Sequence, residues 1–222
     1  MRTIAVIARK GGSGKTTVAV HVAIAAHLRG KRVLLADSDP QCSSSTVLRG
    51  RRAAGPDYAE TCGTQLPALQ LAAVRRDFDA MVIDTAAGAE DELAHAIVLA
   101  DLCLLVIRPT FLDFAAAIRT ADVLRQLKKP GVMVLNQAPV SRNGAEPPLV
   151  KKAHEALRLM RLTVAPTILR SRTAYQQAME NGCSAEELGP SPAAQEVAEL
   201  WAFVERLTFG TTAAQQAERL RA

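Results

Sequence analysis

Aromatic side chains, cysteines and long apolar runs are all scarce in this sequence of 222 residues. Aromatic residues make up 4% of the chain, although hydrophobic residues make up 49%. We therefore expect a core of Ala, Val, Leu and Ile, which is common where helices pack closely on a parallel sheet. No apolar run reaches membrane-spanning length, and a predicted strand begins too early to leave room for a signal peptide. These absences predict a cytoplasmic protein.

The few cysteines include no pair at metal-ligand spacing; they are Cys42, Cys62, Cys103 and Cys183. In a reducing compartment, thiols placed in this way are usually structural. Cys103 lies inside an apolar segment that predicts a buried strand, which counts against a role in iron–sulfur chemistry. We therefore expect no cluster-delivery function.

Negative charge is in deficit, because the net charge is +5. The whole excess falls between residues 141 and 175, where two acidic residues accompany seven basic ones: Arg142, Lys151, Lys152, Arg158, Arg161, Arg170 and Arg172. A basic zone on an otherwise neutral body indicates a polyanion as partner. The alternative is an ordinary solvated helix face.

A glycine-rich segment, Lys-Gly-Gly-Ser-Gly-Lys-Thr-Thr at residues 10–17, is the most informative stretch. Residues 3–8 before it predict a buried strand, and residues 18–28 after it predict a buried helix. A glycine turn between strand and helix lets backbone N–H groups and the helix N-terminus converge on phosphate oxygens. Lys15 would reach the β- and γ-phosphates, and the Thr16 hydroxyl would bind Mg²⁺. The expected nucleotide-binding residues are Lys10, Gly11, Gly12, Ser13, Gly14, Lys15, Thr16 and Thr17.

The segment resembles the deviant Walker A loop of ParA-type partition ATPases and their MinD-like relatives. Arg9 stands where the standard motif has its first glycine, and a second lysine, Lys10, directly precedes the glycine pair. The resemblance implies that Lys10 reaches across a dimer interface to the nucleotide of the other subunit. Lys10 and Lys15 are therefore candidate catalytic residues. The alternative is a glycine turn that binds nothing.

Two further predicted strands end in carboxylates. Residues 31–36 lead to Asp37 and Asp39, and residues 80–83 lead to Asp84. Ligands of doubly wound sheets bind at the edge where strands end, so these carboxylates should lie near the glycine loop. An apolar strand closing on Asp84 matches a Walker B arrangement, which makes Asp84 a candidate metal residue. For Asp39 the resemblance implies positioning of the attacking water and a place in the Mg²⁺ shell, which makes it a candidate catalytic and metal residue; a turn carboxylate is the alternative.

The segment that starts at Asp84, Asp-Thr-Ala-Ala-Gly, resembles the second switch of the family, with Ala86 and Ala87 where prolines are usual. Further along, we expect Asp113 to cap or open a helix that runs to Lys128; the family alternative places it at the dimer face. Asn136 follows a strand at residues 132–135, and the resemblance implies that it reads the adenine edge, against a turn-capping alternative.

A helix is predicted from residue 147 to residue 161, with Leu149, Ala153, Leu157 and Met160 on its buried face. Basic residues line the opposite face, and two more arginines follow at a predicted strand end near residues 167–172. The expected DNA-binding residues are Lys151, Lys152, Arg158, Arg161, Arg170 and Arg172.

The pattern as a whole predicts an α/β fold with a doubly wound, mostly parallel sheet and helices on both faces. We expect one domain at residues 1–209 and a polar tail at residues 210–222. The resemblance implies an ATP- and Mg²⁺-dependent partition ATPase that dimerises with ATP and binds DNA without sequence preference. Hydrolysis, stimulated by a ParB-like centromere-binding partner, would release the DNA.

Other functions remain open at this point. One alternative is a MinD-like positioning ATPase at the membrane, but the tail lacks the large apolar side chains of a membrane-binding amphipathic helix. We therefore expect no membrane partner and a nucleoid-associated protein. Another alternative is an ATPase that positions a protein cluster rather than DNA. A third is a module that binds nucleotide without turnover, which the joint presence of Lys15, Thr16, Asp39 and Asp84 disfavours.

Overall fold

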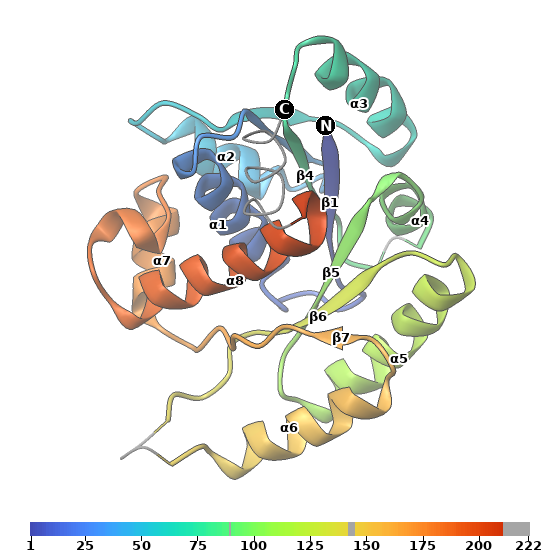
Figure 1. Ribbon diagram of the computed structural model, residues 1–222, viewed down its shortest axis with the longest axis vertical. Coiled ribbons are helices and arrows are strands. Elements are labelled where there is room, and N and C mark those ends of the chain that lie inside the picture. The colour runs from blue at the N-terminus through green and yellow to red at the C-terminus, as the bar shows by residue number, and fades with distance from the viewer. Residues whose placement is uncertain (89, 142–144, 211–222) are drawn as a thin grey trace, which may run out of the picture.

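The computed structural model describes residues 1–88, 90–141 and 145–210. Within these ranges seven strands form one sheet in the order β3-β2-β4-β1-β5-β6-β7 (Figure 1). All neighbouring pairs are parallel. The strands are β1 (Arg2–Ile7), β2 (Val33–Asp37), β3 (Asp57–Glu60), β4 (Ala80–Asp84), β5 (Leu102–Ile107), β6 (Gly131–Leu135) and β7 (Thr163–Val164).

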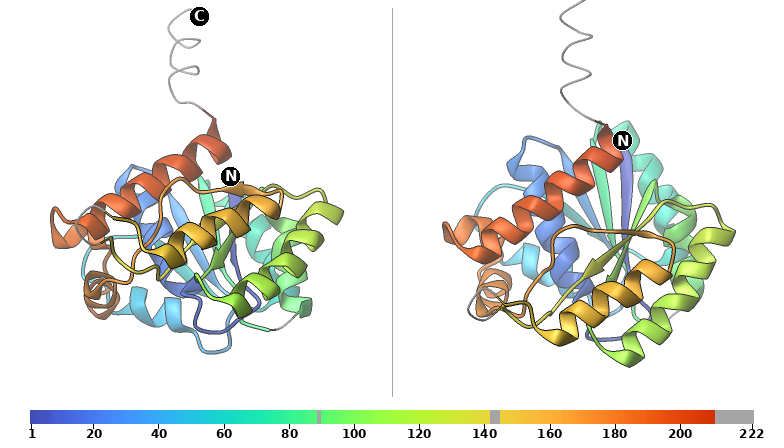
Figure 2. Two further views of the ribbon diagram at one scale, coloured as in Figure 1. Left: turned by 90° about the horizontal axis from the view of Figure 1, so that it is seen from below. Right: turned by 60° about the horizontal axis from the view of Figure 1, so that its bottom comes forward.

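The helices cover both faces of the sheet (Figures 1 and 2). One face carries α1 (Lys15–Leu28), α2 (Ser43–Arg49), α7 (Thr173–Glu180), η2 (Ala185–Leu188) and α8 (Pro192–Phe209). The other carries α3 (Leu66–Arg75), α4 (Glu90–Leu99), α5 (Phe111–Gln126) and α6 (Pro148–Leu159). The short helix η1 (Gly63–Gln65) leads into α3. This arrangement confirms the predicted doubly wound fold.

The central strands are apolar and buried along their whole length, as strands covered by helices on both sides must be. Every residue of β2, β4 and β5 is buried. Helix α1 is buried almost all round, because it packs between the sheet and α8. Its alanines and valines allow this close approach, and Trp201 of α8 is fully buried in the same core.

Strand β1 lies between β4 and β5, so the chain turns to opposite sides of β1 at this point of the sheet. Such a switch point leaves a crevice at the carboxyl ends of the strands, which is where ligands of open α/β sheets bind. The glycine loop follows β1 directly and therefore occupies this crevice.

Both edge strands differ from the sequence prediction. Strand β3 was not predicted: it is mostly exposed and has no apolar run, so its pairing with β2 defines it. At the other edge β7 is formed by residues 163–164, whereas residues 167–172 join the sheet through one isolated bridge, between Ala138 and Arg170. The predicted strand end at Arg170 and Arg172 was therefore wrong.

The predicted buried face of α6 was correct at Ala153, Leu157 and Met160 but wrong at its first position. Leu149 is 49% exposed, and Val150 is fully buried instead. The helix begins at Pro148, which turns Leu149 outward. No helix in the described ranges is both long and apolar enough to cross a membrane.

Candidate nucleotide-binding site

The glycine loop runs between β1 and α1, and its shape requires glycine at two positions. Gly12 and Gly14 have φ angles of 73° and 88°, in the left-handed region that side chains disfavour. At Gly14 there is also no room, because a Cβ atom would stand 2.2 Å from the amide nitrogen of Asn136. The predicted loop is thus a tightly specified turn that ends where α1 begins, at Lys15.

Two side chains that follow β6 hold this loop from outside. The Asn136 amide Nδ2 donates a hydrogen bond to the Ser13 carbonyl at 2.8 Å, and Gln137 Nε2 donates to the Gly12 carbonyl at 3.0 Å. Gln137 was not among the residues predicted at this site. Its only signal is its place beside Asn136 at the end of a strand, where side chains reach the crevice.

The resemblance implied that Asn136 contacts the adenine edge, whereas in this structure Asn136 contacts the glycine loop. Its amide nitrogen is bonded to the loop backbone, and the residue is only 5% exposed. It does line a groove of about 720 Å³ beside the start of α1, together with Thr17, Arg170 and Tyr175. The groove is large enough for a nucleoside, so the adenine role stays a prediction beside the loop-holding role.

Asp37 and Asp84 lie side by side at the ends of β2 and β4, as predicted. Asp37 is satisfied by the backbone: it accepts hydrogen bonds from the N–H groups of Asp39 at 3.2 Å and Ser45 at 2.8 Å. These two hydrogen bonds describe Asp37 as a turn carboxylate that holds the backbone after β2. Asp84 is fully buried, and neither of its carboxylate oxygens has a hydrogen-bond partner among the described residues.

The electrostatics of this cluster follow from burial. Burial raises the pKa of Asp84 to about 7, and the negative charge of Asp37 adds to the effect. The Thr16 and Ser44 hydroxyls and the Lys15 ammonium group oppose this shift. Burial also lowers the pKa of Lys15, against the attraction of Asp84 and Asp39. The site therefore contains a desolvated cation, Lys15, and a desolvated anion, Asp84, and a ligand that interacts with both charges would offset the cost of their burial.

These residues fit a Mg²⁺ ion bound with a nucleotide. A bare buried carboxylate next to a hydroxyl, here Asp84 and Thr16, offers the hard oxygen ligands that Mg²⁺ takes. Asp39, half-exposed, lies nearby, and its Oδ1 accepts the N–H of Gln41 at 2.9 Å. No group of three or more His, Cys, Asp and Glu residues in the described parts could hold a metal alone. Mg²⁺ usually takes one or two carboxylates and completes its shell with water and phosphate.

Lys10 lies at the rim of the loop, with its Nζ 3.9 Å from Asp113 Oδ2. Asp113 was predicted to cap or open α5; it lies in the first turn and so opens the helix, but it is not the N-cap. Thr110 is the capping residue, because its side chain accepts the N–H of Asp113. The Asp113 carboxylate instead accepts hydrogen bonds from Arg108 and from the Thr110 hydroxyl. Arg108, which was not among the predicted site residues, thereby joins the end of β5 to the first turn of α5.

The segment after Asp84 is tied to neighbouring strands. The Thr85 hydroxyl donates to the Val6 carbonyl at 2.9 Å, and both the N–H and the hydroxyl of Ser38 donate to the Asp84 carbonyl. Ala86 is buried, and Gly88 has a φ of 76°. Arg9, before the loop, forms an ion pair with Glu90, the first residue of α4. The predicted second switch thus contacts β1, the strand that leads into the glycine loop.

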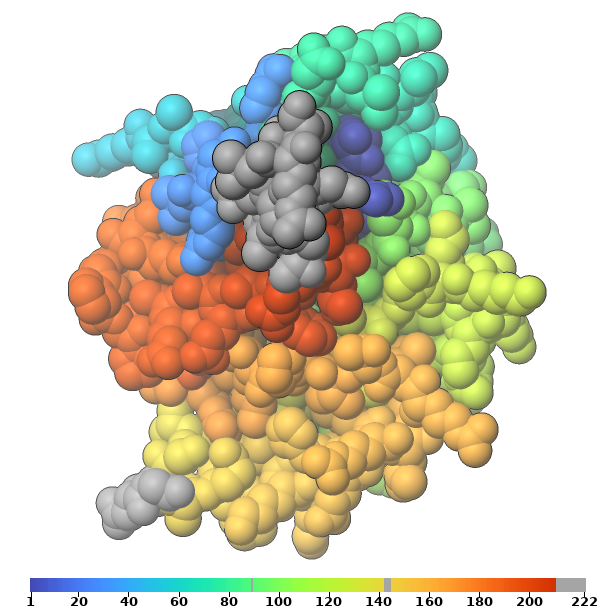
Figure 3. Space-filling view, viewed as in Figure 1, coloured from blue at the N-terminus to red at the C-terminus, as the bar shows by residue number. Residues whose placement is uncertain are grey.

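The predicted DNA-binding residues fall into two groups. Lys151, Lys152, Arg158 and Arg161 are exposed, on or just after α6, which occupies the lower part of the face in Figure 3. Arg170 and Arg172 differ, because Glu146 binds Arg170 at 2.7 and 2.8 Å and Glu196 binds Arg172 at 2.8 Å. Their side chains are only 11% and 27% exposed, so these two were poor candidates for DNA contacts. Arg142 lies outside the described residues.

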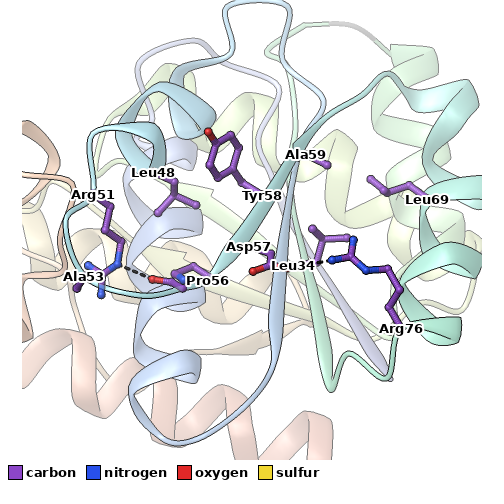
Figure 4. A pocket seen from close by; sticks show the side chains of 11 residues that line it. Leu34, Leu48, Arg51, Ala53, Pro56, Asp57, Tyr58, Ala59, Leu69 and Arg76 are labelled. Carbon is purple, nitrogen blue, oxygen red and sulfur yellow. Dashed lines mark hydrogen bonds and ion pairs between the residues drawn. The ribbon is translucent and has the colours of Figure 1, made fainter.

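A second hollow, of about 410 Å³, opens beside the edge strand β3 (Figure 4). Arg51 and Arg76 face it from opposite sides, but both are already paired. Arg51 binds the Gly55 carbonyl and Glu187, and Arg76 binds Asp57. The hollow therefore offers no uncompensated charge comparable to that of the P-loop.

Comparison with known proteins decides the family. Residues 4–188 match the CobQ/CobB/MinD/ParA nucleotide-binding domain family, which covers most of the chain and the whole site. The chain belongs to the ParA/MinD family of ATPases. Family membership confirms the predicted ATPase class, and the seven-stranded parallel sheet confirms the predicted fold.

Three proteins of known name or structure are similar to the chain over most of its length. Maintenance of carboxysome distribution protein A of Gloeobacter kilaueensis is 32% identical over 189 residues, which are 82% of this chain and 83% of that protein. An ATP complex of a McdA variant from Cyanothece aligns with a TM-score of 0.75 at 18% identity, over 93% of this chain and 96% of that one. The septum site-determining protein MinD of Pyrococcus horikoshii, in complex with Mg-ADP, aligns with a TM-score of 0.74 at 20% identity, over the same shares.

The two structural matches show the fold alone; one of these proteins is in complex with ATP and the other with Mg-ADP. The sequence relative is named for carboxysome distribution and not for DNA partition. The chain is therefore a ParA/MinD-family ATPase, and these relatives agree better with the predicted alternative, a positioning ATPase, than with the main prediction of DNA partition.

Proposed function

We propose that this chain is an ATP-dependent positioning ATPase whose cargo is a protein assembly. Similarity to a carboxysome distribution protein over 82% of this chain supports this cargo. The two-lysine glycine loop supports an ATP-gated dimer as the working state. DNA partition stays the second candidate, supported by the exposed basic residues of α6.

In the nucleotide-bound form, Lys15 and the loop backbone bind the phosphates, and Thr16 and Asp84 hold Mg²⁺. Mg²⁺ neutralises phosphate charge in such sites. Asp39 positions the attacking water. The groove beside Thr17, Asn136 and Tyr175 accepts the nucleoside. This assignment gives the orphaned Asp84 carboxylate and the desolvated Lys15 the partners that their burial requires.

In the dimer, Lys10 of each subunit contacts the phosphates of the other. Lys10 is suited to this exchange because its side chain is 36% exposed and its contact with Asp113 is long. The dimer would then bind DNA without sequence preference through Lys151, Lys152, Arg158 and Arg161, as phosphate contacts by Lys and Arg allow. We infer a cytoplasmic, nucleoid-associated protein with a partner that stimulates hydrolysis.

The decisive experiment compares cargoes in the native cell. Deletion of the gene should disperse or cluster a protein assembly while plasmid and chromosome-origin inheritance stays normal; the reverse result would restore DNA partition as the function. A Lys15→Ala strain should reproduce the deletion, since it lacks the phosphate-binding cation. In vitro, flotation with ATP and anionic liposomes should leave the protein unbound, and clear co-flotation would favour the membrane alternative.

A further inference from the structure

Arg108, the first residue after β5, faces the glycine loop with one edge of its guanidinium group. A Cβ atom placed on Gly12 would stand 3.4 Å from Arg108 Nη1, so this nitrogen lies directly against the loop. The side chain is 27% exposed, which leaves it open to a ligand in the crevice. Arg108 thus reaches the loop from the end of β5, whereas Lys10 and Lys15 belong to the glycine-rich segment itself.

The opposite edge of the guanidinium group is fixed. Its Nε donates to Asp113 Oδ1 at 3.0 Å, and its Nη2 donates to Asp113 Oδ2 at 3.2 Å. The Thr110 hydroxyl binds the same carboxylate and so holds Asp113 in turn. Because the guanidinium group is a rigid plane with five donors, fixing one edge aims the other. In the described part of the chain, Nη1 has no hydrogen-bond acceptor of its own.

The charges around Asp113 leave an excess of one positive charge at the loop. Burial alone would raise the pKa of Asp113, but hydrogen bonds from Arg108 and Thr110 and the charges of Arg108 and Lys10 bring it below its usual value. The carboxylate is therefore ionised beside two cations, Arg108 and Lys10. Without Arg108, the charges of Asp113 and Lys10 would cancel. The incoming phosphates would then meet a buried carboxylate that is offset by one lysine only.

We propose that Arg108 is a second cationic ligand for the phosphates bound by its own subunit's glycine loop, beside Lys15, and that Asp113 is the residue that positions it. The proposal rests on the nucleotide binding proposed above. A planar guanidinium group with a free N–H edge matches phosphate oxygens in geometry as well as charge. The competing explanation is that Arg108 only fastens the start of α5 through Asp113.

Calorimetry with Mg-ATP and with Mg-ADP separates these explanations. The variants are Arg108→Gln and Arg108→Lys, with Arg125→Gln as the matched control. Arg125 also pairs with an aspartate on α5, Asp122, but near the far end of the helix, about 20 Å along its axis. We expect Arg108→Gln to weaken nucleotide binding at least tenfold, Arg108→Lys about threefold or more, and Arg125→Gln less than twofold. A loss confined to ATP would place the contact on the terminal phosphate, and an equal loss for ADP would place it on the inner ones.

Thermal unfolding without nucleotide identifies a purely structural role. If Arg108→Gln lowers the melting temperature but binds nucleotide like the wild type, the proposal is overturned. If Arg108→Gln does not fold, Arg108→Lys carries the test, and unchanged affinity in that variant overturns the proposal. Absence of nucleotide binding by the wild type would instead overturn the proposed function itself, so the two failures are distinguishable.

Discussion

Gly14 and Asn136 compete for the same space: a Cβ atom on Gly14 would lie 2.2 Å from the amide nitrogen of Asn136, which donates to the neighbouring Ser13 carbonyl. The contact joins residues 122 positions apart in the chain and fixes the glycine loop against the end of β6. The shape of the glycine loop therefore depends on side chains that follow distant strands.

The substitution Gly14→Ala should therefore disable the loop. It adds a Cβ in the left-handed region, which costs about 1–2 kcal/mol, and it displaces Asn136. We expect ATP binding to weaken more than tenfold in calorimetry. Gly30→Ala is the matched control, because Gly30 has a φ of 81° but nothing within 4 Å of an added Cβ. The control should lose stability by about 1–2 kcal/mol and keep its ATP affinity. Equal ATP affinity in both variants would show that the contact with Asn136 is unimportant.

Asp84→Asn should separate stability from function. Asp84 is buried without a hydrogen-bond partner in the described structure, and burial raises its pKa to about 7. Because the unfolded chain ionises this group near pH 3.8 and the folded protein only near pH 7, its contribution to stability is lost as the pH rises between these values. At pH 8 the amide should therefore raise the free energy of unfolding of the nucleotide-free protein by up to about 4 kcal/mol. The same variant should lose the Mg²⁺-dependent part of its ATP affinity.

Asp101→Asn serves as the control for this prediction. Asp101 is an exposed carboxylate whose Oδ2 accepts the N–H of Thr3 at 2.7 Å, so it already has a partner. We expect the control to be no more stable than the wild type in urea unfolding and to bind Mg-ATP normally. Destabilisation by Asp84→Asn would contradict our description of a carboxylate whose burial costs stability in the nucleotide-free protein.

Acid should destabilise the protein through His21. Its Nδ1 lies 2.8 Å from the Thr17 carbonyl, whereas its Nε2 is buried with no hydrogen-bond partner among the residues that the structure describes. Burial lowers its pKa to about 4. Because the unfolded chain binds this proton near pH 6.5 and the folded protein only near pH 4, stability falls as the pH decreases between these values. The loss attributable to His21 is roughly 3 kcal/mol. Urea unfolding at several pH values should show a shallower slope for His21→Phe than for the wild type or His154→Gln.

Lys10→Ala should abolish the ATP-dependent dimer while ATP still binds to each subunit. The expected result in light scattering with Mg-ATP is a monomer, because the proposed contact across the interface is lost. Lys128→Ala, at an exposed position just after α5, is the control and should dimerise like the wild type. A dimer of Lys10→Ala at wild-type affinity would remove the cross-subunit role and leave nucleotide binding intact.

The two groups of basic residues should respond differently to substitution. Replacing Lys151, Lys152, Arg158 and Arg161 with alanine should weaken non-specific DNA binding and reduce the salt slope by about one for each lost phosphate contact. Arg170→Ala should instead lower stability, because it leaves Glu146 without its partner. Filter binding at several salt concentrations, together with thermal unfolding, tests both. DNA binding that depends on Arg170 as strongly as on the α6 residues would contradict this division.

Much of this protein was decided by local sequence. The apolar runs of β1, β2, β4 and β5 define buried strands because strands covered on both faces must be apolar throughout. The glycine spacing defines the phosphate loop because only glycine adopts its left-handed angles cheaply. Carboxylates that directly follow such strands reach the same edge of the sheet, which is why Asp39 and Asp84 could be placed from the sequence.

The tertiary structure decided what depends on distant partners. Strand β3 has no apolar pattern and exists through its pairing with β2. Arg170 and Arg172 carry the same charge as the lysines of α6, yet Glu146 and Glu196 compensate them. Arg108 and Asn136 reach the loop from the ends of β5 and β6, and no local pattern encodes those contacts. Sequence patterns record which side chains a segment presents, whereas packing determines which distant group each of them meets.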